Sequence, residues 1–357
     1  MREIRRLLVL VATAFAVEAQ SVQVQSAPPV DFLALVDSNS PAYWSDGRLY
    51  LFNSLELPIR SESSDNVTFG RARAVYVHGT NHWRWIESVW QDTDGTVYAW
   101  YHAEPLNVCP GQALTAPEIG ALVSSDGVSF RDLGIVLRSG DKPDCGTSNR
   151  YFAGGHGDFS VIPDRQGSNF YFLFTNYGGD VESQGIAIAR VAYADLAKPA
   201  NHVWKFFQGD WSEAGLGGRV TPVFAARANW NSDAPDSFWG PAVHWNTALG
   251  EYVVLMNHAA DRLWGQEGVY ISFCPDIANP AAWTPATKLM DAGAWYPEVI
   301  GNGVGETDTL VGASARLYVM GHSEWQLTFG TTASENTPSP DPVVNGQVVP
   351  KSPKLRH

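Results

Sequence analysis

The chain has 357 residues, of which 12% are aromatic and only 17% are charged, against about 25% charged residues in an average soluble domain. Its 33 glycines and 22 prolines are spread along the sequence, which excludes a coiled coil, a collagen-like repeat and a disordered chain. The formal net charge of -13 argues against nucleic-acid binding, which needs lysine and arginine to neutralise phosphates. An all-β fold with many turns is favoured.

Residues 1–19 have the pattern of a secretory signal peptide. A basic start with three arginines precedes the apolar run Leu7–Val17 and an A-x-A-like cleavage site at Val17–Ala19. An apolar run of about 11 residues is too short to span a bilayer, and no later stretch reaches the length of a membrane span. We therefore expect a secreted or periplasmic protein without a membrane span. A buried N-terminal strand is the alternative interpretation of this segment.

A hairpin pattern recurs through the rest of the chain. Each copy enters a strand from a polar or acidic turn, passes a second turn and returns through a strand rich in aromatic and apolar residues. The copies lie at residues 37–52, 86–101, 157–174, 239–256 and 295–320. Because four strands with their turns need about 40 to 50 residues, the spacing predicts an all-β, five-bladed β-propeller. A β-sandwich with coincidental hairpins is the alternative.

The pattern also defines the expected domain boundaries. The propeller domain is predicted over residues 20–330, with the segment Ser26–Val36 completing the last blade and closing the ring. Long helical patterns are absent, and the best helical candidate, Ala189–Lys198, is short. Residues 331–357 are rich in proline, serine and threonine, so a disordered tail is predicted.

Three cysteines allow one disulfide bond in an oxidising compartment. Cys109 and Cys145 lie in loops rich in glycine and proline, whereas Cys274 ends an apolar run typical of a strand. We predict a Cys109–Cys145 disulfide and a buried free thiol at Cys274, although three pairings are open. The cysteines are too few and too scattered for a zinc site.

Carboxylates recur at the start of the first strand of the repeats. In a propeller these strands surround the central channel, so residues far apart in sequence converge there. Four copies have an acidic residue at this place and one has a tryptophan; the residues are Asp37, Glu87, Asp158, Trp239 and Glu298. We expect a functional cluster of carboxylates in the channel. His102 is predicted to face the funnel near a strand end; it is interpreted as a structural histidine, with a contact to a ligand or a structural cation as the alternative. Glu104 is interpreted as a solvated loop residue.

The segments DSNSPAYWSDGRLYLF (37–52), GDFSVIPDRQGSNFYFLF (157–174) and SSDGVSF (124–130) resemble the five-bladed propeller glycoside hydrolases. That group includes the family 43 arabinanases and xylosidases and the family 32 and 68 fructan enzymes. The resemblance covers roughly residues 30–330 at the level of the repeat pattern. It implies that Asp37 acts as base or nucleophile, and that Asp158 orients the sugar and tunes pKa values.

The expected general acid is missing from its usual place. Members of the group often have a glutamate two residues before a proline in the fourth repeat, where this chain has Trp239, Gly240 and Pro241. The carboxyl group can instead come from Glu298 or Glu87, with Glu298 preferred; His156 and His244 are further candidates. Expected substrate-binding residues are Glu87, Asn149, Arg150, His156, Trp239, His244, Trp295 and Tyr296.

Together these features predict a glycoside hydrolase acting on a polysaccharide or oligosaccharide, with furanosides such as arabinan or fructan as the first expectation. Glycosidic cleavage needs one protonated carboxyl group and one ionised carboxylate, which a channel of clustered acids can supply. No cofactor is expected; the resemblance allows a structural calcium ion, but the sequence has no ligand motif for it. The alternatives are a non-catalytic carbohydrate-binding propeller and a polysaccharide lyase that uses the same funnel.

Overall fold

The computed structural model describes residues 19–332 except 56, 80–83 and 262. It divides into two compact units, Val22–Gly330 and a second one made of Met1–Ser21 and Thr331–His357. The predicted signal peptide and tail therefore lie almost entirely outside the described residues, and both stay predictions. In the described part, no helix has the length and apolarity needed to cross a membrane.

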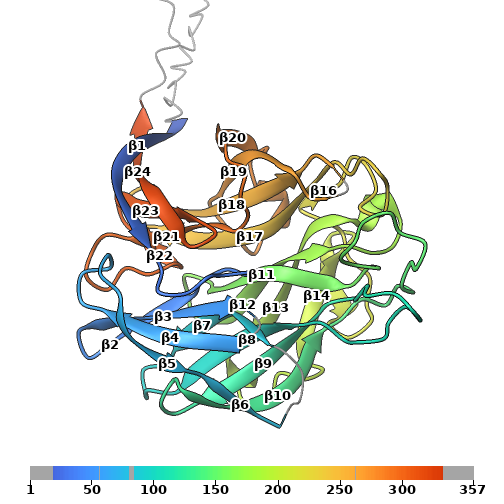
Figure 1. Cartoon of the computed structure of the whole chain (residues 1–357), viewed down its shortest axis with the longest axis horizontal. Coiled ribbons are helices and arrows are strands. Elements are labelled where there is room, and N and C mark those ends of the chain that lie inside the picture. The colour runs from blue at the N-terminus through green and yellow to red at the C-terminus, as the bar shows by residue number, and fades with distance from the viewer. Residues whose placement is uncertain (1–18, 56, 80–83, 262, 333–357) are drawn as a thin grey trace, which may run out of the picture. The chain divides into compact units, whose positions relative to one another are not determined.

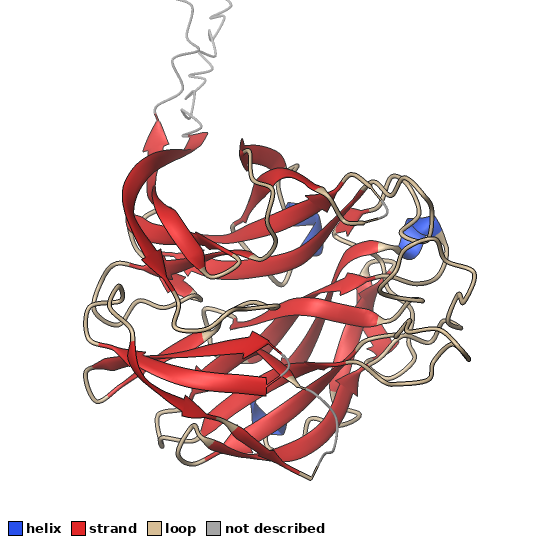
Figure 2. Ribbon diagram, in the orientation of Figure 1, coloured by secondary structure: helices blue, strands red, loops and turns tan. Residues whose placement is uncertain are grey.

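The unit Val22–Gly330 contains five sheets that form the blades of a β-propeller (Figures 1 and 2). Contacts between neighbouring sheets run through the first strand of each blade: β2 contacts β7, β7 contacts β11, β11 contacts β17, and β17 contacts β21. These strands are β2 (Ala42–Ser45), β7 (Trp85–Gln91), β11 (His156–Pro163), β17 (Ser237–Asn246) and β21 (Pro297–Gly301). Each predicted repeat supplies one of them. The five-bladed propeller is confirmed, and the β-sandwich alternative is wrong.

The remaining strands continue each blade as an antiparallel meander. The first blade adds β3 (Arg48–Leu55), β4 (Leu57–Ser63) and β5 (Gly70–Ala74). The second adds β8 (Val97–Ala103), β9 (Glu118–Ser124) and β10 (Ser129–Leu137), with β6 (Tyr76–His78) parallel to β10. The third adds β12 (Asn169–Asn176), β13 (Gly185–Ala192), β14 (Val203–Phe207) and β15 (Asp210–Ala214), with β16 (Phe224–Ala225) beside β13.

The fourth blade adds β18 (Glu251–Ala259), β19 (Gln266–Cys274) and β20 (Thr287–Met290), with β22 (Leu310–Val311) parallel to β17. The fifth adds β23 (Ser314–Val319), β24 (His322–Thr332) and β1 (Ala19–Asp31). Among the described residues, three short 3-10 helices occur, at Val181–Ser183, Tyr193–Asp195 and Pro280–Ala282. The expected helix over Ala189–Lys198 is wrong, because its first residues belong to β13.

The N-terminal strand closes the ring, as expected, but with earlier bounds. Strand β1 pairs with β24 and ends at Asp31, rather than covering Ser26–Val36. Alternation explains the earlier start: Val22 and Val24 pack against the core of the blade, while the glutamines between and after them are exposed. Such a period of two is the pattern of a strand with one buried face.

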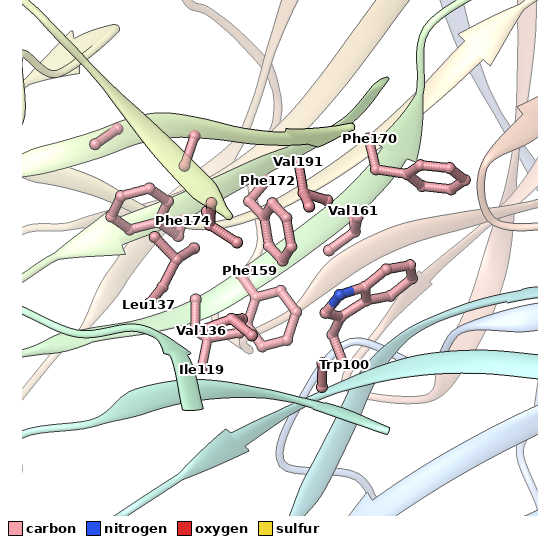
Figure 3. Close-up of a cluster of buried hydrophobic side chains, with 14 of the residues drawn as sticks. Trp100, Ile119, Val136, Leu137, Phe159, Val161, Phe170, Phe172, Phe174 and Val191 are labelled. Carbon is pink, nitrogen blue, oxygen red and sulfur yellow. The ribbon is translucent and has the colours of Figure 1, made fainter. Parts of the chain in front are cut away.

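Aromatic side chains fill the space between blades. Between the second and third blades, Trp100 of β8 packs edge-on against Phe172 of β12, with ring centroids 5.8 Å apart (Figure 3). Phe159 of β11 belongs to the same cluster and is fully buried. Large rings suit this place because blades that radiate from one axis diverge and leave wide gaps. Much of the aromatic excess in the sequence therefore serves to pack neighbouring blades against each other.

Candidate active site

A pocket of about 160 Å³ lies at one end of the channel. Its lining comes from the segments that enter the first strands β2, β7, β11 and β21, from the end of β8, and from three loops. The lining residues are Asp37, Trp85, His102, Glu104, Ala113, Thr115, Arg150, Tyr151, Phe152, Asp158, Trp264, Trp295 and Tyr296. Of the residues expected to form the site, the structure brings Asp37, Asp158, Arg150, Trp295 and Tyr296 together here.

Asp158 is placed by a bulge in β11. The register against β12 shifts between Gly157 and Phe159, and Asp158 itself has a φ of 38°, a region sparsely populated by residues other than glycine. A bulge redirects a side chain out of the strand alternation. The Asp158 carboxylate accepts hydrogen bonds from the hydroxyl groups of Tyr177 and, at 3.3 Å, Tyr296. Burial raises the pKa of Asp158, against the opposing charge of His102.

The Tyr296 hydroxyl group lies between two carboxylates. Its oxygen is 3.3 Å from Oδ1 of Asp158 and 3.5 Å from Oδ1 of Asp37. A phenol has one proton to donate, so it can serve only one of the two acids at a time. Burial raises the pKa of Tyr296 well above its ordinary value, and the charges of Asp158 and Asp37 raise it further. Tyr296 therefore stays protonated and links the two acids.

His102 is surrounded by acids. Its Nδ1 is 3.2 Å from Oε1 of Glu87, and its Nε2 is 3.5 Å from Oε1 of Glu104. Burial alone would lower the pKa of His102, but the neighbouring Glu104 and Glu87 carboxylates raise it well above its ordinary value. The backbone N–H of Asp158 lies 3.3 Å from the same Nδ1. A neutral ring accepts from this N–H, whereas a protonated ring pairs with the Glu87 carboxylate instead, because one nitrogen cannot do both.

Glu87 contacts this histidine from the side that faces away from the pocket. Its side chain is 1% exposed and does not line the pocket. Its second carboxylate oxygen accepts from the backbone N–H of Phe159 at 2.7 Å. Burial raises the pKa of Glu87, while His102 acts in the opposite direction. The structure thus gives Glu87 contacts with protein groups in place of the expected direct contact with a ligand.

The sequence predicted that His102 faces the funnel, with a structural role preferred, but Glu104 was not expected in the pocket. Both lie at or beyond the end of β8, which runs antiparallel to β7 and pairs His102 with Trp85. A return strand ends where its partner begins, so these residues reach the same end of the channel as Glu87. The hairpin pattern therefore contains a signal that predicts the position of Glu104 as well as that of His102.

Glu298 and Trp239 are not in the pocket. Glu298 is 2% exposed, and its carboxylate accepts from the backbone N–H of Ser40 at 2.6 Å. Burial raises the pKa of Glu298 to about 8. Trp239 is fully buried and packs against Trp264 and Tyr296. A shift of register in β17 after Trp239 accompanies this inward orientation, so Trp239 supports the aromatic wall from behind and has no surface for a ligand.

The remaining candidates also lie elsewhere. The Nε2 of His156 is 2.9 Å from Nζ of the buried Lys205, and His156 borders a different cavity. His244 is fully buried, and burial lowers its pKa to about 3. Asn149 is buried next to Arg150, and its side-chain oxygen accepts from the backbone N–H groups of Tyr151 and Phe152. Asn149 therefore shapes the loop that presents Arg150 and Tyr151.

The predicted disulfide is confirmed and joins two loops at the rim. Cys109 lies between β8 and β9, and Cys145 lies between β10 and β11, with Cα atoms 5.5 Å apart. The same two loops are linked by a β-bridge between Thr115 and Phe152, which both line the pocket. The bond thus restrains the pocket wall. Cys274 is free and buried, as predicted.

One group of side chains could bring metal ligands together. One ligand atom from each of Glu87, His102 and Asp158 lies within 4.8 Å of the other two. The closeness of His102 Nδ1 to the two carboxylates accounts for this grouping. Calcium prefers about six to eight oxygen ligands, and only Glu87 and Asp158 offer oxygen here, so this donor set does not fit calcium and the calcium ion stays a prediction.

No family model matches the sequence, and no curated protein matches it either. The structure is similar to an endo-arabinase from Bacteroides thetaiotaomicron VPI-5482, with 12% identity and a TM-score of 0.52 over 87% of this chain and 99% of that one. It is also similar to a thermostable family-43 glycoside hydrolase, with 11% identity and a TM-score of 0.54 over 90% and 100%. At such identities the likeness shows the fold. The expected five-bladed propeller architecture of these hydrolases is therefore confirmed for this divergent chain.

Proposed function

We propose that the protein is a glycoside hydrolase that cleaves a polysaccharide or oligosaccharide in the pocket. The observation that carries the proposal is the meeting of Asp37 and Asp158 at one hydroxyl group, that of Tyr296. Aromatic rings form much of the surrounding wall, and flat rings suit the C–H faces of sugars. The fold shared with an endo-arabinase and a family-43 glycoside hydrolase supports the same reaction class, with arabinan as the first substrate to test.

Asp37 is assigned as base or nucleophile. It is partly exposed and lines the pocket, so its carboxylate can reach a water molecule or the anomeric carbon. Asp158 is buried at 2% exposure and held by two tyrosine hydroxyl groups. A carboxylate held so firmly suits the orientation of a sugar hydroxyl group and the stabilisation of positive charge on the ring in the transition state.

Glu104 replaces Glu298 as the assigned proton donor. Glu104 lines the pocket and its side chain is 30% exposed, whereas Glu298 is buried against Ser40. Glu104 acts in its protonated form: in the first step its carboxyl group gives its proton to the glycosidic oxygen while the bond from that oxygen to the anomeric carbon breaks. The carboxylate that remains is the form that pairs with His102. In an inverting reaction Asp37 takes a proton from the attacking water; in a retaining one it bonds to the carbon first.

A specific observation favours a second candidate, a non-catalytic carbohydrate-binding propeller. The place where related hydrolases often have their acid is occupied by Trp239, and that side chain is fully buried. If Glu104 does not donate a proton, the pocket binds sugar without turnover. A lyase acting on a uronate polymer is the third possibility, because the cationic Arg150 lines the pocket.

One set of assays separates the three functions. The purified protein is incubated with arabinan, β-1,3-galactan, xylan, levan and polygalacturonate, and both reducing ends and ultraviolet-absorbing unsaturated products are measured. We expect reducing ends without unsaturation. Asp37→Asn and Glu104→Gln should each lower the rate at least about 100-fold, the usual scale for loss of an acid or base.

Asp291→Asn is the matched control, because the Asp291 side chain is 93% exposed and outside the pocket. It should retain the activity of the unaltered chain. Unchanged hydrolysis in Asp37→Asn would refute the assignment. Saturable binding without any product would support the non-catalytic alternative, and unsaturated products would support the lyase.

A further inference from the structure

A second hollow, of about 330 Å³, lies at the far ends of the strands that carry the pocket. Strand β7 has Trp85 in the pocket and Gln91 in this hollow; β11 has Asp158 in the pocket and Pro163 in the hollow. Six residues of strand separate Trp85 from Gln91, which corresponds to about 20 Å. We call this cavity, which is separate from the pocket and from the cavity beside His156, the distal hollow. A ligand there cannot touch Asp37 or Asp158.

Three tryptophans from three blades form the walls of the distal hollow. Trp44 lies on β2, Trp90 on β7 and Trp245 on β17. All three are partly exposed, unlike the fully buried Trp100 and Trp239. Rings needed only to fill space between blades would have no reason to remain in contact with solvent. Their accessible surface is therefore the feature that requires an explanation.

The rings are fixed in place by neighbours outside the hollow. The Nε1 of Trp44 donates to the backbone carbonyl of Glu306 at 2.6 Å. Trp90 packs against Phe170 and Trp245 against Tyr252, each edge-on with centroids 4.9 Å apart. Side chains that are already ordered lose little conformational entropy when a ligand binds. The walls are thus pre-organised for a rigid, flat partner.

The polar groups of the distal hollow point to an uncharged ligand. Asp164 and Arg165 are the charged side chains of the lining, and their formal charges cancel. Asp164 is engaged in its own turn, where it accepts from the backbone N–H groups of Ser168 and Asn169. The guanidinium group of Arg165 lies over the Trp245 ring, 4.6 Å from its centroid. Gln91 and Thr309 add partly exposed groups that can bond hydroxyl groups.

We propose that the distal hollow is a second, non-catalytic binding site for a neutral glycan chain. Indole surfaces accept the apolar C–H faces of sugar rings, while amide, hydroxyl and guanidinium groups bond the hydroxyl groups around the ring edge. A purely apolar peptide would leave these polar groups unpaired. An anionic polymer would gain no net attraction from a lining whose formal charges cancel, and it would approach a chain with a net charge of -13. The site would hold the protein on a polymer independently of cleavage.

The test uses the full chain carrying Asp37→Asn, so that bound polymer is not degraded. Binding to soluble arabinan, β-1,3-galactan, xylan and levan is measured by affinity electrophoresis and calorimetry. We expect saturable binding to at least one polymer. Trp90→Ala and Trp245→Ala should each weaken it about tenfold, the scale expected for loss of one aromatic contact.

Trp204→Ala is the matched control, because Trp204 is a tryptophan on β14 with 44% exposure that lines neither the pocket nor the distal hollow. Arg165→Ala is a second test variant that leaves the tryptophans in place, should a tryptophan variant fail to fold; it should weaken binding severalfold. The proposal is overturned if no polymer binds, or if the distal variants bind like the Trp204→Ala control. It is also overturned if only Trp295→Ala, in the pocket, loses binding. Hydrolysis by the unaltered chain is scored separately, so this result does not depend on the proposed reaction.

Discussion

The buried ion pair between Glu87 and His102 offers a quantitative test of how the pocket is built. Glu87→Gln keeps the shape of the side chain and its ability to accept from the backbone N–H of Phe159, but removes its charge. The partners are 1% and 5% exposed and 3.2 Å apart. The substitution leaves the His102 imidazolium without its nearest counter-charge in a place largely shielded from water.

The size of the effect follows from burial. Removing one partner of a buried pair destabilises a protein by about 3 to 5 kcal/mol, because the other charge stays uncompensated. Glu104 at 3.5 Å and Asp158 at 3.8 Å still face His102 and offset part of the loss. We therefore expect a decrease in the free energy of unfolding of about 3 kcal/mol. For a unit of this size it corresponds to about 5 °C in melting temperature.

Urea denaturation followed by tryptophan fluorescence measures the difference at pH 7. Glu62→Gln is the control, because Glu62 pairs with Arg71, whose side chain is 72% exposed, and such pairs contribute only about 0 to 1 kcal/mol. A Glu87→Gln protein that loses no more stability than this control would refute the reasoning. It would mean that His102 is neutral in the folded protein and that its surroundings do not depend on Glu87.

Three further predictions concern the site and its support. Glu298→Gln should match the unaltered chain in stability near pH 4 and exceed it near pH 9. The folded carboxyl group has a pKa of about 8 against an ordinary 4.5, so the unaltered chain loses stability as pH rises from about 4.5 to about 8. Melting temperatures of the two proteins that run parallel across pH would contradict this. Tyr296→Phe removes the hydroxyl group between Asp37 and Asp158, so it should reduce kcat about tenfold or more. The lost hydrogen bond contributes about 1.5 kcal/mol or more at a charged partner, so the melting temperature should fall by only about 3 °C; unaltered kinetics would show that the link is not used. The Cys109–Cys145 bond joins residues 36 positions apart in sequence, and its reduction should lower the free energy of unfolding by about 4 kcal/mol. Urea denaturation with and without reductant measures the difference, and equal midpoints would count against the prediction.

The repeat architecture could be predicted from the sequence because hairpins are local. Strand, turn and return strand lie within some 20 residues, so the pattern of residues 157–174 is enough to predict that this segment forms a hairpin. The five predicted starts therefore match β2, β7, β11, β17 and β21. The disulfide could be predicted for a similar reason. Two cysteines in turn-rich loops are free to meet, whereas Cys274 ends a strand and is buried there.

The composition of the pocket depends on distances between blades, which no local pattern contains. Glu298 occupies the expected place in its repeat, but it turns to the backbone of Ser40 instead of the pocket. Glu104, which looked like a solvated loop residue, lines the pocket. Glu104 reaches the pocket because it lies beyond the end of β8, next to the start of β7. A shift by one residue reverses the direction of a side chain, and such shifts in β11 and β17 place Asp158 and Trp239.

The sequence by itself therefore determined a charge-poor, aromatic-rich propeller with acids at the entry to its channel. Only the tertiary structure decided which acids share a pocket and which tryptophans keep a surface for a ligand. Trp239 and Trp245 lie six residues apart on one strand, yet one is fully buried and the other borders the distal hollow. The physical reason is that the burial of each ring depends on the side chains that pack against it from neighbouring blades, and these contacts join residues far apart in the chain.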